Sequence, residues 1–179
     1  MNKARTFICL IFCMFLMGCS FASAQRVIPV SAKTGVQMAM EMKPVLLANG
    51  ISFDGPVRIN DGVGTAYPHT VISIVGQKEH PVTLFIYEDE TERASSILAM
   101  CDITDKKALH DMSMLISVAL YGLGLRKEEV DQLIQVHETG MDDRRSDYWC
   151  RSIGKRVATQ IHYLRDKGGV GYRILAYEE

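Results

Sequence analysis

A short polar segment around residue 147 holds the side chains best suited to grip another molecule. Its charged and aromatic residues are Asp142, Asp143, Arg144, Arg145, Asp147, Tyr148, Trp149 and Arg151. Arginine guanidinium groups can make bidentate contacts with a carboxylate or a phosphate. Trp, Tyr and Arg are also the residues that dominate protein recognition surfaces. We expect this segment to be a partner-binding loop, with a solvated loop of self-compensating charges as the alternative.

Cys101 and Cys150 are the two cysteines that lie outside residues 1–24. An even number of cysteines in an exported chain favours a disulfide. This bond would close a loop of roughly 50 residues and stabilise the fold by about 4 kcal/mol in the chain-entropy model. We therefore predict a Cys101–Cys150 disulfide beside Trp149. The Trp149 ring then either joins the recognition surface or packs over the disulfide in the core.

No catalytic or metal-binding motif is complete in this sequence. None of the five histidines belongs to an H-E-x-x-H or H-x-H pattern, and no serine lies in a G-x-S-x-G turn. We therefore predict no catalytic residue, no cofactor and no metal ligand. The rival hypothesis is a small hydrolase whose histidine and aspartate meet only in the folded chain.

Residues 1–24 have the features of a secretory signal that is removed from the mature protein. Lys3 and Arg5 precede an apolar run over residues 7–17, which is shorter than the roughly 20 residues that a membrane-spanning helix needs. Ala22-Ser23-Ala24 then fits a signal-peptidase site, so we expect the mature chain to begin at Gln25.

The signal also contains a second candidate processing site. Leu16-Met17-Gly18-Cys19 resembles the sequence at which a lipoprotein is lipidated, and Cys19 would then be the N-terminus. Cleavage before Gln25 gives a periplasmic or secreted protein, whereas lipidation of Cys19 gives a membrane-anchored one. A purely structural lipoprotein attached through Cys19 is therefore a further alternative.

Charge limits the class of partner. The chain has 20 Lys and Arg against 21 Asp and Glu, and loss of Lys3 and Arg5 with the signal leaves a net charge of −3. This balance argues against a nucleic-acid partner, which requires a basic face, and it leaves the lipid at Cys19 as the only expected membrane contact. Our leading hypothesis is a non-enzymatic binding, inhibitor or immunity-type module whose partner is another protein or a small envelope ligand.

Hydrophobic patterns predict the elements that position these residues. Helices are expected over residues 33–48, 89–101, 105–121 and 127–137, and strands over residues 51–60, 67–75, 81–87, 156–163 and 172–176. The order predicts an α+β fold in which residues 25–179 form a single domain, with a mostly antiparallel sheet of five to six strands packed against three to four helices.

Two of these segments carry further expectations. Residues 82–87 carry apolar side chains on both faces of the predicted strand. This pattern predicts a central strand that is covered on both sides. The turn at Tyr67-Pro68-His69 is the second candidate for a binding surface, should the segment from Asp142 to Arg151 be a solvated loop that binds no partner.

Overall fold

The computed structural model describes residues 26–60, 67–135, 145–164 and 168–178, which include three helices and eight strands. In chain order these elements are β1 (Val27–Ile28), α2 (Gly35–Ala48), β2 (Phe53–Asn60), β3 (His69–Val75), β4 (Val82–Glu88), β5 (Ala94–Asp102), α3 (Lys106–Gly122), α4 (Lys127–Gln135), β6 (Arg145–Cys150), β7 (Lys155–Leu164) and β8 (Gly169–Tyr177).

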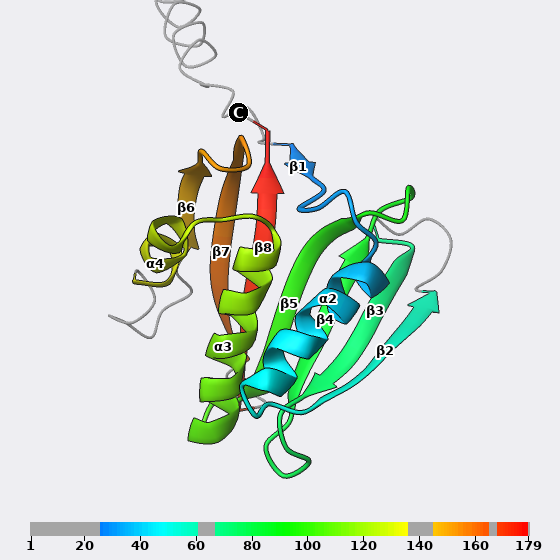
Figure 1. Ribbon diagram of the computed structural model, residues 1–179, viewed down its shortest axis with the longest axis vertical. Helices are drawn as coiled ribbons and strands as arrows, with labels where there is room; N and C mark the ends of the chain where they lie inside the picture. Colours follow the sequence, from blue (N-terminus) through cyan, green and yellow to red (C-terminus); the bar gives the residue numbers. More distant parts are fainter. Residues whose placement is uncertain (1–25, 61–66, 136–144, 165–167, 179) are drawn as a thin grey trace, which may run out of the picture.

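The strands form one antiparallel sheet in the order β2-β3-β4-β5-β8-β7-β6. β1 pairs with the last residues of β8, where Val27 lies opposite Tyr177. The preceding residues of β8 pair with β5. Figure 1 shows α2 and α3 crossing one face of this sheet, with α4 on the same side near β6. We call the opposite face, which no helix of the described residues covers, the open face.

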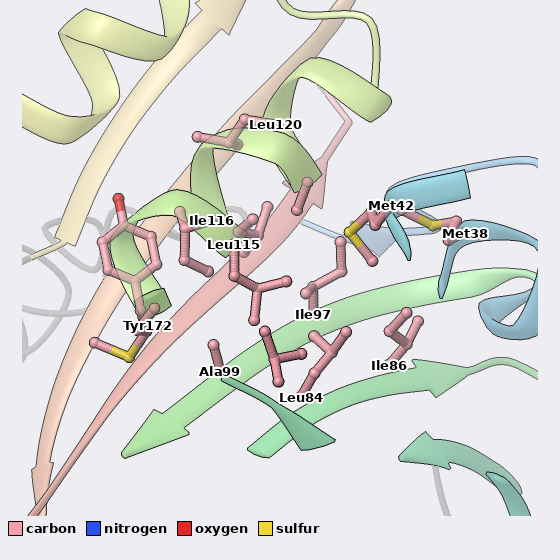
Figure 2. Packing of buried hydrophobic residues seen from close by; sticks show 14 of the residues in the cluster. Met38, Met42, Leu84, Ile86, Ile97, Ala99, Leu115, Ile116, Leu120 and Tyr172 are labelled. Carbon is pink, nitrogen blue, oxygen red and sulfur yellow. The ribbon is translucent and has the colours of Figure 1, made fainter. Parts of the chain in front are cut away.

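The main hydrophobic core lies between the helices and the sheet. On β4, Val82, Leu84 and Ile86 are fully buried, while the residues between them are only partly buried. Side chains of α2 and α3 meet this row, among them Met38 and Leu115 (Figure 2). Each fully buried Leu or Ile contributes about 1.5–3 kcal/mol by leaving water. This packing fixes which side chains of each strand point to the open face.

A buried carboxylate ties the start of α2 to β4. Thr34 caps the helix, and Gln37 completes the capping box. The backbone N–H of Gly35 donates to Glu88 Oε1 at 2.6 Å, which places the fully buried Glu88 at the positive end of the helix dipole. A Cβ on Gly35 would lie 2.9 Å from Val71 Cγ2, so the close approach of the helix to the sheet depends on glycine.

Residues 89–101 are a turn followed by β5, so the prediction of a helix there is wrong. Asp89 does not cap a helix, because its Oδ1 accepts two backbone N–H groups of the β4–β5 turn. β5 lies between β4 and β8, with Ile97 facing the helices and Leu98 facing the open face. Because both faces of this strand are largely apolar, it lacks the polar–apolar alternation that identifies most strands.

The predicted sheet was also too small. The described residues contain eight strands instead of five to six, since β1, β5 and β6 join the five strands that the sequence indicated. The three described helices fall within the three to four expected, and the α+β class with an antiparallel sheet holds.

Candidate functional site

Apolar side chains run across four strands on the open face. The strand register places Val57 beside Ile72, Ile72 beside Phe85, and Phe85 beside Leu98. We call these four residues, together with Ile59 and Ile74, the apolar row. Contiguous apolar surface of this kind on a monomer commonly marks an interaction site.

The β2 end of the apolar row is the most accessible. Val57 is 60% exposed, Ile59 40% and Ile74 39%.

The prediction that residues 82–87 are covered on both faces is wrong for the described part of the chain, because helices pack on one side of β4 only.

Beside the apolar row lies a cluster of aromatic rings around one arginine. Arg173 Nε donates to Ser96 Oγ at 2.9 Å, and Arg173 Nη2 donates to the Tyr67 hydroxyl at 3.3 Å. The Arg173 guanidinium carbon lies 6.0 Å from the centroid of the Tyr87 ring, within the range of a cation–π contact. The rings of Tyr67 and Tyr87 are 5.3 Å apart, and Phe85 stacks on Tyr87 at 6.3 Å. We call Tyr67, Tyr87 and Arg173 the tyrosine–arginine cluster.

The β6 side of the open face has a different chemistry. Arg156 Nη1 donates to Asp147 Oδ1 at 2.9 Å across β6 and β7. Trp149 lies opposite Arg156 in the register and is half-buried on the same face. Nearby, a small second hydrophobic cluster lies apart from the main core and consists of Ala158, Leu175 and Tyr177. The open face thus continues from the apolar row to this charged and aromatic edge.

The segment predicted to be a binding loop is largely a strand. Asp142, Asp143 and Arg144 lie outside the described residues, while residues 145–150 form β6. Asp147 and Trp149 share the open face, whereas Tyr148 points to the opposite face and packs against the main core. Arg151 is exposed in the turn that follows. The structure therefore separates side chains that the sequence placed on one surface, because successive residues of a strand point to opposite faces.

The expected disulfide is absent, and both cysteines are free. Cys101 pairs with Val170 of β8, and Val170 pairs with Tyr163 of β7. Cys150 pairs with Lys155 at the other end of β7. The eight residue steps from Lys155 to Tyr163 span about 26 Å of strand. A disulfide requires Cα atoms within about 7 Å, so this register excludes the bond.

Each thiol is instead part of the packed interior. Burial raises the pKa of Cys101 to about 11, with the nearby Asp105 and Asp102 adding to the shift. Burial likewise raises the pKa of Cys150 to about 12. Because the thiolate is the reactive form, neither cysteine is an activated nucleophile at neutral pH.

One histidine has the carboxylate partner that the hydrolase hypothesis requires. His80 Nδ1 lies 2.8 Å from Asp105 Oδ2. Asp105 is also the N-cap of α3, and its pKa is lowered by the hydrogen bond from the Ala108 N–H and then by His80. In the described residues, no hydroxyl or thiol hydrogen-bonds to His80. His80 and Asp105 therefore form a pair at the N-terminus of α3, and within the described residues this pair has no hydroxyl or thiol nucleophile bonded to it.

Neither a metal centre nor a membrane span is evident in the described chain. No three His, Cys, Asp or Glu residues of the described ranges are grouped so as to hold a metal ion. None of the described helices combines the length and the apolar character that crossing a bilayer requires.

The chain matches no protein-family model, no curated protein and no solved structure. Sequence reasoning missed Phe85, Tyr87 and Arg173, although the apolar residues on both faces of residues 82–87 were a usable signal. Tyr67 belongs to the turn that the sequence named as the second candidate.

Proposed function

We propose that the mature chain is an exported, non-enzymatic binding module that docks a protein partner onto the open face. The observation that carries this proposal is the apolar row, which lies uncovered by the described chain and borders the tyrosine–arginine cluster. Residues 1–24 support export, because their pattern is that of a secretory signal.

The energetics favour a protein as the occupant. Full burial of a Val or Ile side chain contributes about 1.5–3 kcal/mol, and the exposed residues Val57, Ile59 and Ile74 lie on the open face of the paired strands β2 and β3. A partner with an apolar patch of matching size would bury all three together. Tyr and Arg next to this patch match the residue types at the energetic centres of protein interfaces.

The scaffold also lowers the cost of binding. The apolar row belongs to strands that pair with neighbours along their length, and Arg173 is already held by Ser96 and Tyr67. These side chains therefore lose less conformational freedom on binding than side chains of a mobile loop would.

A site-specific photo-crosslink tests the proposal in the native cell. A photoreactive amino acid replaces Ile74 on the open face or, as a matched control, Leu47 on α2, which is a similarly exposed apolar residue on the helical side. We expect one discrete protein adduct from position 74 and none from position 47. The mass of the adduct shows whether the partner is a different protein or a second copy of this chain.

Substitutions provide the second arm of this experiment. Val57→Asp together with Ile74→Asp should abolish the adduct from a photoreactive residue placed at Ile59, because a carboxylate buried in an apolar interface is strongly disfavoured. Leu47→Asp should leave it unchanged. Equal thermal midpoints for the variants and the wild type exclude unfolding as the cause. An adduct that survives the double substitution, or one that forms equally from position 47, would refute docking on the open face.

A further inference from the structure

A cavity of about 590 Å³ opens at the end of the sheet where the N-terminal segment passes from β8 toward the β4–β5 turn. Residues 26–29, 31 and 32 form one wall, and Tyr67, the β4–β5 turn, Ser95, Lys155 and Glu178 contribute the others. Its volume lies within the range of about 300–1,000 Å³ that is usual for small-molecule sites. The groups that line it come from five separate parts of the chain.

The N-terminal wall of this cavity is anchored to the sheet. β1 pairs with β8, and the backbone N–H of Ser31 donates to Ala94 O at 3.2 Å. Lys155 Nζ donates to Pro29 O at 3.2 Å, which ties the middle of the wall to the start of β7. The cavity therefore has a defined shape, as a preformed ligand site requires.

Positive charge is in excess around the cavity. Arg26, Arg93 and Lys155 line it, against the two carboxylates of Asp89 and Glu178. Asp89 and Arg93 pair with each other, because Asp89 Oδ2 accepts from Arg93 Nη2 at 3.2 Å, while Asp89 Oδ1 accepts backbone N–H groups of its own turn. This leaves Arg26 and Lys155 opposite the one remaining lining carboxylate, Glu178.

We propose that this cavity binds a small organic anion, in which a compact apolar body carries a carboxylate, sulfonate or phosphate group. The apolar body lies against Val27, Ile28 and the ring of Tyr67. The anionic group lies near Lys155 and Arg93, because the Arg93 guanidinium has further N–H donors beyond those given to Thr91 and Asp89, and charged N–H donors suit such oxygens. This site is separate from the apolar row, and its proposal does not depend on docking at the open face.

Naphthalene-2-sulfonate and naphthalene-2-sulfonamide test the proposal, since they share one apolar body and differ in charge. Binding to the mature protein is followed by calorimetry and by backbone amide shifts in NMR. We expect the sulfonate to bind saturably, with shifts at Val27, Ile28 and Ser95, and the sulfonamide to bind at least about tenfold more weakly, since hydrogen bonds to charged groups are the stronger ones. Raising the salt concentration should weaken the sulfonate alone.

Three variants locate the bound anion. Lys155→Gln with Arg93→Gln should weaken sulfonate binding at least about tenfold, since each removes a charged donor. Lys127→Gln, at an exposed lysine of α4, should leave it unchanged. Because Lys155 also holds the cavity wall, Arg26→Gln serves as an independent variant, and it should weaken binding without loss of thermal stability.

Three results would overturn the site: equal affinity for both naphthalenes, full affinity in both the double variant and Arg26→Gln, or no saturable binding at millimolar probe. Loss of binding in Ile74→Asp with retention in Lys155→Gln and Arg93→Gln would also overturn it, because it would place the probe on the open face.

Discussion

Replacement of Glu88 by glutamine should destabilise the fold far more than its size suggests. Glu88 is fully buried and accepts hydrogen bonds from the Gly35 N–H at 2.6 Å and from Arg58 Nε at 2.7 Å. The glutamine amide can replace only one of these acceptors, so one donor loses its partner. Arg58 also contacts Glu92 at 3.0 Å, but Glu92 is half-exposed and cannot substitute for the buried carboxylate.

The expected loss follows from burial. Breaking a buried ion pair by removing one partner costs about 3–5 kcal/mol. Arg58 is about one third exposed, at 32% of its side-chain surface, so water screens part of the pair and we expect about 2–4 kcal/mol for Glu88→Gln. Glu41→Gln is the matched control, because Glu41 pairs with Lys33 at 2.5 Å while both side chains are about half-exposed. That control should cost no more than about 0.5 kcal/mol.

Urea unfolding of the mature protein at neutral pH measures both losses. The two variants should shift the midpoint without changing the slope, since neither alters the surface exposed on unfolding. A double-mutant cycle of Glu88→Gln and Arg58→Gln measures the interaction free energy between the two side chains. This coupling energy should exceed about 1 kcal/mol. If Glu88→Gln costs less than about 1 kcal/mol, or no more than Glu41→Gln, the claim that burial makes this contact strong is wrong.

The remaining predictions concern pH, thiol chemistry and processing. Burial opposes ionisation of Glu129, but hydrogen bonds to its carboxylate outweigh burial and lower its pKa from the ordinary 4.5. Its ionised form therefore stabilises the fold above about pH 4.5, and the stability difference between wild type and Glu129→Gln should shrink as pH falls to about 3 in urea titrations. Cys101 and Cys150 should resist a thiol reagent in the folded protein and titrate as two thiols in denaturant; an intramolecular disulfide in the mass spectrum would contradict the register. Intact mass should show a mature chain that begins at Gln25, whereas a lipid-modified Cys19 would move the protein to the membrane.

Much of the fold was predictable because its elements follow simple periods. α3 begins where Asp105 accepts the backbone N–H groups of Lys107 and Ala108, and its buried residues recur at helical spacing. The alternation of residues 156–163 predicts a strand, and β7 forms there, although Val157, Ala158 and Thr159 are buried in succession. In such elements the local pattern and the tertiary environment agree, so the sequence alone identifies them.

The errors occur where the environment of a strand is not encoded locally. β1 has two residues and exists only through pairing with β8, which lies some 150 positions further along the chain. β5 is apolar on both faces, so its residues fit helical spacing as well as strand spacing. β6 contains a run of charged and aromatic residues whose alternation becomes meaningful only after its partner β7 is known. The Cys101–Cys150 prediction was wrong for the same reason, since the order of the strands sets the distance between the thiols.

One error bears directly on function. Residues 82–87 are apolar on both faces, and that pattern predicts cover on both sides. In the described chain the helices cover Val82, Leu84 and Ile86, while Phe85 faces the open side with Ile72 and Leu98 as its neighbours. A strand of this composition at the centre of a sheet is typical of one that packs on both faces. The second layer that this sequence calls for is, on our proposal, the partner protein.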